Sequence, residues 1–201
     1  MKKTLILCFS LITMSLQVNA FNESDLDKLR ETNICPKCDL VGADLAGMTL
    51  EGTDLTGANL EGASLSGASL MGSKLNDTSF IRANLKGANL QKTSLQRASF
   101  LNADCTGVIL KESDMTEAYL EETNLSGADL TNANMTKVYM EGTNLQGATL
   151  VGVNLTSAYM EGVKLNSTNL SGATLESVRG FDDLRLCRTI MPNGSVNNSD
   201  C

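Results

Sequence analysis

A strict five-residue period constrains the fold of this chain more than any other feature of its sequence. From Leu40 to Leu175 every fifth residue is apolar, at 28 consecutive positions of which 21 are Leu. The others are Phe80, Phe100, Cys105, Met115, Met135, Met140 and Met160. Five residues turn an α-helix by about 140°, so a helix would spread these side chains over every face, and a flat strand would alternate them between two faces. The chain must therefore turn a corner once in every five residues.

Each unit of five residues follows one pattern: a small residue, a polar residue, the apolar residue, a second polar residue and a residue that is often Gly. Residues 58–62 (Ala-Asn-Leu-Glu-Gly) are an example. The small and apolar residues are two positions apart, so both point inward from an extended segment. The small position holds Ala, Thr, Ser or Val at 26 of 28 places, the exceptions being Cys38 and Met48. This pattern predicts a core of stacked Leu residues with small residues beside them.

A second, longer period sets the number of sides. Three Tyr residues recur at a constant spacing, and each is followed two positions later by a Glu: Tyr119, Tyr139 and Tyr159 precede Glu121, Glu141 and Glu161. A coil of four units has the length of this spacing, whereas a three-sided coil would place a Tyr at position 134, which is Asn134. The sequence therefore predicts an all-β solenoid, a four-sided (quadrilateral) β-helix of about seven coils. At a strand spacing of roughly 4.8 Å, the rod is about 35 Å long.

These repeats resemble those of the pentapeptide-repeat family, whose consensus is a small residue, Asp or Asn, Leu or Phe, a polar residue and Gly. The likeness covers residues 38–177. It implies the fold of that family, a right-handed quadrilateral β-helix. Some members protect DNA gyrase by imitating DNA, so the resemblance also implies topoisomerase protection as an alternative function. A shared fold does not by itself fix the function.

The N-terminal segment 1–20 differs from the rest of the chain. Lys2 and Lys3 give a charged start, and the apolar stretch Leu5–Leu16 is shorter than the roughly 20 residues that a spanning helix needs. Residues 18–20 (Val-Asn-Ala) form a typical signal-peptidase site. We therefore expect a signal peptide at 1–20, cleavage after Ala20, and an exported protein that is periplasmic or secreted. A retained membrane anchor is the alternative.

The segments on either side of the repeats are expected to cover the open ends of the solenoid at residues 38–177. An N-terminal cap at 21–37 contains a short helix within 22–34, for which Ser24 and Asp27 form a capping-box pattern. A C-terminal cap at 178–201 brings apolar residues and a turn at 192–194 (Pro-Asn-Gly). The apolar residues are Phe181, Leu184, Leu186, Ile190 and Met191.

Cysteine placement agrees with two caps. In an oxidising compartment, we expect one disulfide between Cys35 and Cys38 and another between Cys187 and Cys201, each within one cap. Cys105 stands at a Leu position and is expected to be a buried thiol. A zinc site shared by all four cap cysteines is excluded, because zinc holds each sulfur at about 2.3 Å and the caps lie at opposite ends of the rod.

The segment 35–38 (Cys-Pro-Lys-Cys) also has the form of a redox motif, which makes a secreted thiol-disulfide oxidoreductase a third function. The segments Cys-Pro-Lys-Cys-Asp-Leu before the repeats and Arg-Thr-Ile-Met-Pro-Asn-Gly-Ser after them resemble flanking motifs of related proteins. That resemblance favours caps over redox chemistry.

Composition argues against catalysis and against anionic partners. Removal of Lys2 and Lys3 leaves 14 basic and 23 acidic residues, a net charge of −9, which disfavours nucleic acid and membrane surfaces as partners. The chain has no His and no Trp, and it shows no metal-ligand cluster, phosphate-binding loop or nucleophile elbow. We expect no enzymatic activity, cofactor or metal. Residues 73–98 carry five bases against Asp77, and we interpret them as a solvated surface: Lys74, Arg82, Lys86, Lys92 and Arg97.

One side of the solenoid is expected to gather large outward-facing groups. It carries the three Tyr residues together with Ile81 and Leu101, and the repeated Glu121, Glu141 and Glu161 form its rim. Stacked rings can simply stabilise a sheet, by about 0.2–1 kcal/mol for each cross-strand pair. They can also dock a protein partner or a second copy, because Tyr is enriched at interfaces. The sequence therefore predicts a non-enzymatic, exported binding or structural module.

Overall fold

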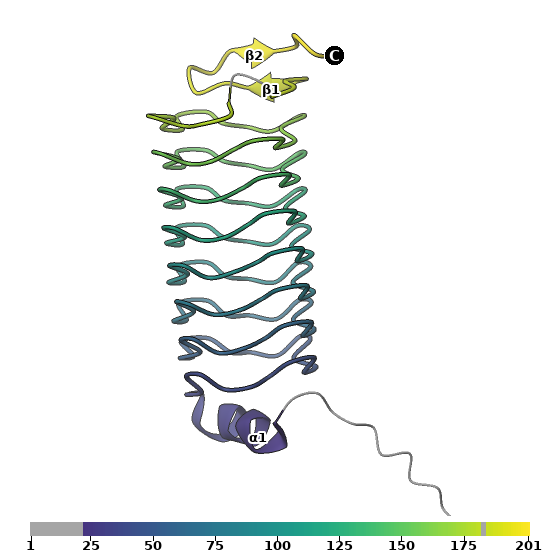
Figure 1. Ribbon diagram of the computed structural model, residues 1–201, viewed down its shortest axis with the longest axis vertical. Coiled ribbons are helices and arrows are strands. Elements are labelled where there is room, and N and C mark those ends of the chain that lie inside the picture. Colours follow the sequence, from purple (N-terminus) through teal and green to yellow (C-terminus); the bar gives the residue numbers. More distant parts are fainter. Residues whose placement is uncertain (1–21, 182–183) are drawn as a thin grey trace, which may run out of the picture.

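The computed structural model describes residues 22–181 and 184–201 (Figure 1). The described residues wind into a tall stack of coils, with one helix at the N-terminal end of the stack and two short strands at its C-terminal end. The signal segment predicted at residues 1–20 lies outside the described residues, and its cleavage stays a prediction. Among the helices in the described part of the chain, none is long and apolar enough to cross a membrane.

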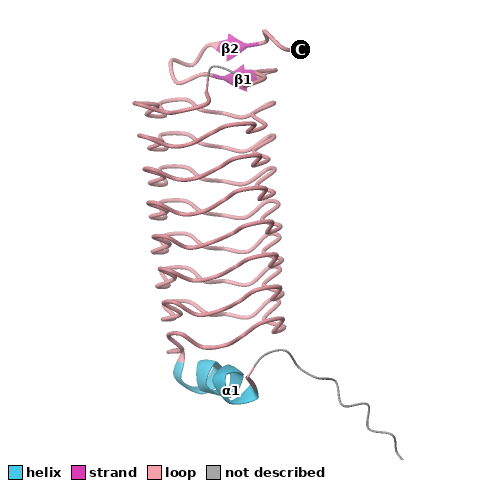
Figure 2. Cartoon of the chain, viewed as in Figure 1, coloured by secondary structure: helices cyan, strands magenta, loops and turns pink. Residues whose placement is uncertain are grey.

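The coils pair with one another at a constant spacing of four five-residue units along the chain. Parallel bridges join Asp39 to Asn59, Tyr119 to Tyr139 and Asn144 to Lys164. The bridges form four columns, one on each side of the coil, so the four-sided period predicted from the Tyr spacing is observed. Each side contributes one bridged residue between two turns, which is why the coils are drawn as loops in Figure 2.

A residue with positive φ forms each corner. The unit around Leu40 is representative: the N–H of Ala43 donates to the carbonyl of Leu40 (3.0 Å) and closes the turn, and Gly42 has φ 69°. The left-handed conformation costs an L-residue roughly 1–2 kcal/mol, which explains the preference for Gly at this place. Asp77 and Arg97 nevertheless adopt it, with φ 58° and 55°.

The core has the composition that the five-residue period predicts. Every apolar position from Leu40 to Leu170 is exposed by no more than 2%, and only the last, Leu175, is half-buried. The rings of Phe80 and Phe100 stack in neighbouring coils, with centroids 4.9 Å apart.

Polar residues in the small position are buried but hydrogen-bonded. The hydroxyl of Thr78 donates to the carbonyl of Leu55 (2.9 Å), and that of Thr143 donates to the carbonyl of Leu120 (2.7 Å). Among the described residues, no buried side-chain nitrogen or oxygen lacks a partner. The cost of burying these hydroxyls is therefore offset by backbone hydrogen bonds.

Helix α1 (Glu23–Thr32) covers the N-terminal end of the solenoid, with Leu26 and Leu29 buried in the same core cluster as the coils. The N-cap is Asn22, whose side chain accepts a hydrogen bond from the N–H of Ser24 (3.0 Å). The capping box predicted for Ser24 and Asp27 is therefore wrong. Ser24 lies within the first turn, and the backbone leaves the helical conformation two residues earlier.

Strands β1 (Thr189–Ile190) and β2 (Val196–Asn197) form an antiparallel pair at the C-terminal end. Ile190 also bridges to Asn169 in the last coil, so β1 continues one side of the solenoid. Leu184 and Leu186 are buried there, and Phe181 and Met191 pack partly against the core. These apolar contacts cover the last coil.

Candidate functional site

Tyr119, Tyr139 and Tyr159 stack in three consecutive coils, and we call this set the tyrosine ladder. Backbone bridges join each residue to the next. The ring centroids of Tyr119 and Tyr139 lie 5.2 Å apart and those of Tyr139 and Tyr159 lie 5.0 Å apart, with interplanar angles of 7° and 10°. Tyr119 is 41% exposed, whereas the other two rings are half-buried. The predicted column of outward Tyr residues is therefore present as a continuous aromatic stack.

Arg179 extends the tyrosine ladder by one step, and sequence reasoning missed it. Its backbone bridges to Tyr159, its guanidinium carbon lies 5.0 Å from the centre of the Tyr159 ring, and Nη1 donates a hydrogen bond to the Tyr159 hydroxyl (3.1 Å). A guanidinium on an aromatic face is stabilised by a cation–π interaction. The sequence does contain a signal for this contact, because Arg179 occupies the next place in the series formed by the three Tyr residues.

One flank of the tyrosine ladder carries unneutralised acids. Glu121, Glu141 and Glu161 occupy the same place in three consecutive coils, and no described residue forms a salt bridge with any of them. We call these residues the glutamate column. Between the column and the ladder lies a hollow of about 160 Å³, whose lining also includes Met140, Met160, Arg179 and Gly180.

The opposite flank is neutralised by ion pairs. Lys137 pairs with Glu117 (3.3 Å), and Arg97 pairs with Asp77 (2.8 Å). A second hollow, of about 290 Å³, lies on this flank and is lined by Lys137, Tyr139, Ser157, Tyr159, Ser177 and Arg179. The tyrosine ladder thus separates a charge-balanced flank from an acidic one.

Ile81 and Leu101 lie on the same side as the tyrosine ladder. The N–H of Arg82 donates to the carbonyl of Leu101 (2.9 Å), and the N–H of Asn102 donates to the carbonyl of Glu121 (3.1 Å). These bonds place Ile81, Leu101 and Glu121 in one column of consecutive coils. Both apolar side chains are half-buried, so they add less exposed surface than a fully outward pair would.

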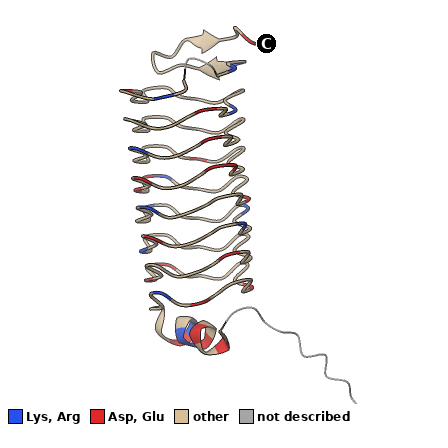
Figure 3. Ribbon diagram, viewed as in Figure 1, with Lys and Arg blue, Asp and Glu red and all other residues tan. Residues whose placement is uncertain are grey.

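The bases of residues 73–98 are mostly paired with acids in adjacent coils. Arg82 pairs with Glu61, and the other pairs are Lys86 with Asp104 (3.0 Å), Lys92 with Glu112 (3.8 Å) and Arg97 with Asp77 (2.8 Å). Figure 3 shows acidic and basic segments interspersed along the stack. This arrangement agrees with a mixed, solvated surface.

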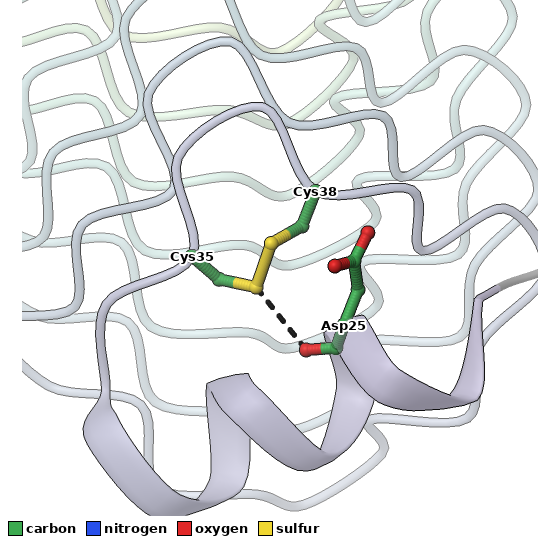
Figure 4. Close-up of side chains that lie close together, drawn as sticks. All are labelled: Asp25, Cys35 and Cys38. Atoms are coloured by element: carbon green, nitrogen blue, oxygen red, sulfur yellow. Dashed lines mark hydrogen bonds between the residues drawn. A yellow bond between two sulfur atoms is a disulfide. The ribbon is translucent and has the colours of Figure 1, made fainter.

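The cap cysteines lie in the predicted pairs. The structure places the sulfurs of Cys35 and Cys38, and those of Cys187 and Cys201, at disulfide distance. Formation of these bonds in the protein stays a prediction. Figure 4 shows the first pair against α1, where the Sγ of Cys35 lies 3.1 Å from the carbonyl oxygen of Asp25. Cys35 is 0% exposed and Cys38 is 3% exposed, so the pair is sealed between the helix and the first coil.

Two other places in the described chain hold groups that can react or bind a metal. The carboxylate of Asp25 and the sulfurs of Cys35 and Cys38 lie within 4.8 Å of one another. When the sulfurs are joined they offer no thiolate to a metal, and the Asp25 carboxylate already accepts a hydrogen bond from the N–H of Asp39 (2.9 Å). Cys105 is buried, and burial raises the pKa of its thiol, so it is unreactive. Neither place makes a candidate active site.

The fold and this surface define a β-solenoid repeat protein with a candidate docking side. The family described as "Pentapeptide repeats" matches the chain in eight copies, over residues 38–77, 78–116, 113–150 and 139–176. The chain therefore belongs to the pentapeptide-repeat family, whose members fold as right-handed quadrilateral β-helices.

Several solved structures resemble this chain. HetL, a pentapeptide repeat protein involved in heterocyst differentiation regulation from the cyanobacterium Nostoc sp. strain PCC 7120, is 23% identical, with 88% of this chain and 99% of HetL covered and a TM-score of 0.47. Rfr23 from the cyanobacterium Cyanothece 51142 is 22% identical, with 81% and 97% covered and a TM-score of 0.36. QnrB1, a plasmid-mediated fluoroquinolone resistance protein, is 22% identical in a trypsin-treated form, with 70% and 81% covered and a TM-score of 0.37. The comparison with curated proteins gave no match.

Proposed function

We propose that this protein is an exported, non-enzymatic binding or structural module, a rod of about seven coils that docks a protein partner or a second copy on its tyrosine-bearing side. The stacked tyrosine ladder is the observation that carries the proposal. Interfaces are enriched in Tyr, because its ring supplies a large contact area and its hydroxyl supplies a hydrogen bond. Ile81 and Leu101 extend the docking side, and the glutamate column forms its rim.

The environment of the acidic and sulfur groups supports a non-enzymatic role. Asp129 is an example of an outward carboxylate that is held by its neighbours: it accepts hydrogen bonds from the N–H and hydroxyl of Thr131 and pairs with Lys111 (3.0 Å). A thiol-disulfide oxidoreductase needs an accessible nucleophilic sulfur, whereas Cys35 and Cys38 are exposed by 0% and 3%. An oxidoreductase is therefore the weakest of the three functions.

Imitation of DNA is the second candidate, and the net charge of −9 after signal removal is the observation that favours it. QnrB1 is described as a fluoroquinolone resistance protein, and gyrase protection is the role that family resemblance suggests. Two observations speak against transferring that role. Basic partners neutralise several acids, including Glu61, Asp77, Asp104 and Glu112, and the predicted signal segment would direct the chain away from gyrase.

Replacement of all three ladder tyrosines by Ser tests the docking side. We expect the circular dichroism of the coil to persist, and we expect self-association in sedimentation, or capture of a partner from the exported fraction, to be lost. Met71→Ser with Ile109→Ser is the control, since these exposed apolar residues lie on another side of the rod. If the tyrosine variant assembles and captures as before while the rod only loses stability, the ladder is structural and the proposal fails.

A further inference from the structure

We infer that the acidic flank of the tyrosine ladder binds an extended, arginine-bearing segment of a partner protein, of which one guanidinium group stacks on Tyr119 and another pairs with the glutamate column. This inference rests on the proposed docking function and names the chemistry of the partner. Three observations on the described residues lead to it: the position of Arg179, the open face of Tyr119 and the missing counter-charge.

Arg179 shows that the tyrosine ladder accepts a guanidinium. It covers the end face of Tyr159 at 5.0 Å and donates a hydrogen bond to the Tyr159 hydroxyl. The faces between Tyr119, Tyr139 and Tyr159 are occupied by the neighbouring rings, because the rings stack almost parallel. A further cation can therefore stack only at the other end of the ladder.

That other end is the outer face of Tyr119. Its bridged neighbour one coil earlier is Ser99, whose side chain is too small to cover a ring. Tyr119 is accordingly the most exposed ring of the ladder, at 41%. Arg97, whose charge interacts with Tyr119, is held by two hydrogen bonds of 2.8 Å from Nε and Nη2 to the Asp77 carboxylate. Among the described residues, Arg179 alone lies over a ladder ring.

The glutamate column supplies the matching charge. Several acids elsewhere in the solenoid are balanced by a base in an adjacent coil, as in Arg97 with Asp77 and Lys137 with Glu117. In the glutamate column, the position one coil before Glu121 is Leu101 and the position one coil after Glu161 is Phe181. The column thus presents like charges at the coil spacing with no base in line, which favours an external cation.

Spacing and shape favour an extended segment that carries Arg. Side chains on one side of an extended chain recur about every 6.6–6.8 Å, so two of them reach across three carboxylates spaced at roughly 4.8 Å. The hollow of about 160 Å³ lies beside Tyr139 and Tyr159, away from the open face of Tyr119, and has room for the stem of a second Arg side chain that pairs with the glutamate column. A guanidinium is flat enough to stack on Tyr and forked enough to bind a carboxylate with two hydrogen bonds, whereas an ammonium group is not.

The direct test measures fluorescence anisotropy of a labelled peptide of alternating Ser and Arg against residues 21–201, with the Lys analogue as a second probe. We expect the Arg peptide to bind more tightly than the Lys peptide. The triple variant Glu121→Gln, Glu141→Gln, Glu161→Gln should weaken binding of the Arg peptide by about tenfold or more. The control variant Asp44→Asn, Glu51→Gln, Glu176→Gln changes the net charge equally on the other three sides, and it should weaken binding by less than about threefold.

Tyr119→Leu separates stacking from charge. It should reduce the preference for Arg over Lys, because a guanidinium gains more than an ammonium group from the open ring face, while the two-point pairing of Arg with the glutamate column is retained. If both triple variants weakened binding of the Arg peptide equally, the binding would be explained by general attraction to an acidic protein, and the inference would be overturned. Concentration-dependent self-association that the glutamate variant abolishes would assign the flank to a second copy and would also overturn it. If the tyrosine-to-Ser variant loses its partner while the glutamate variant keeps it, the docking function stands and this inference falls.

Discussion

At the residue scale, the Asp or Asn before each core residue has a local task that the repeat pattern alone does not reveal. Its Oδ1 accepts a hydrogen bond from the N–H two residues later, as in Asp54 with Thr56 (3.1 Å) and Asn59 with Glu61 (3.1 Å). Such side-chain turns bend the backbone at the corner that follows. From the sequence these residues can be recognised only as outward-facing and polar, because the periodicity indicates which way a side chain points and not which group it hydrogen-bonds.

The five-residue register predicts that neighbouring residues differ sharply in their contribution to stability. Leu90 is fully buried, so Leu90→Ala should leave a cavity and lower the free energy of unfolding by about 2–5 kcal/mol. Asn89→Ser alters the adjacent half-buried residue and should cost less than about 1 kcal/mol. Urea denaturation of both variants measures the difference. Equal losses would contradict the inward assignment of Leu90.

Three partly buried carboxylates predict a loss of stability in acid. For Asp114, burial is the largest single influence and acts to raise its pKa, but hydrogen bonds from Thr116, Gln96 and Asn134 together hold the pKa below its ordinary value. The pKa values of Asp104 and Asp129 are lowered in the same way, by Thr106 with Lys86 and by Thr131 with Lys111.

A folded-state pKa below the unfolded value of about 3.9 means that the carboxylate stabilises the fold above roughly pH 4 and that this stabilisation is lost as the pH falls further. The free energy of unfolding should therefore decrease from pH 6 to pH 3. Asp114→Asn keeps an Oδ1 acceptor but cannot titrate, so this variant should lose less stability over the same range. Urea denaturation at both pH values gives the comparison, and identical pH slopes for the two proteins would refute the role of Asp114.

At the scale of elements, the repeats could be predicted in detail and the caps only in outline. A unit such as residues 58–62 repeats often enough that its inward and outward places follow from periodicity. The tail offers no repetition. Ile190 bridges to Asn169, which lies one residue further back in the chain than the coil spacing predicts for its partner. One extra residue therefore shifts the pairing register of the tail, and no sequence pattern marks its position. The start of α1 is hard to predict for a similar reason, since Asn22 and Ser24 are both good N-cap residues and the sequence does not show that the N–H of Asn22 donates to the carbonyl of Asp39 in the first coil (3.1 Å).

The two cysteine pairs predict different contributions to stability. Cys187 and Cys201 are separated by 14 residues in the sequence, and a disulfide that closes a loop of that size stabilises a chain by up to about 3 kcal/mol. Cys35 and Cys38 are separated by three residues, so a disulfide between them closes a much shorter loop and stabilises the chain less. Cys187→Ser with Cys201→Ser should therefore lower the midpoint of urea unfolding more than Cys35→Ser with Cys38→Ser. Peptide mapping without reductant identifies the linkages directly. A bond between Cys35 and Cys201 within one monomer would refute the separation of the caps.

At the scale of the whole molecule, each coil contacts only its neighbours, so stability accumulates coil by coil and both ends need covers. α1 and the β1–β2 pair supply these covers. Ion pairs between coils, such as Lys86 with Asp104, reduce the repulsion among the acids, while the remaining negative charge favours solubility. A rod of this kind offers its sides as binding surfaces, and here one side differs from the rest in carrying stacked tyrosines.

Export is the whole-molecule prediction on which the choice between functions depends. The charged start, the short apolar stretch and the small residues before position 21 predict cleavage after Ala20. Mass spectrometry of the exported fraction should find a chain that begins at Phe21. Ala20→Arg should block cleavage, because the peptidase requires a small residue at that place, and a heavier precursor should accumulate, whereas Ala20→Ser should be processed normally. Recovery of the chain with Met1 intact from the cytosol, and its absence from the exported fraction, would contradict export.

That result would leave Cys35 and Cys38 in a reducing compartment and remove the reason to expect cap disulfides. It would also make imitation of DNA the stronger candidate function, because the acidic rod would then share a compartment with gyrase.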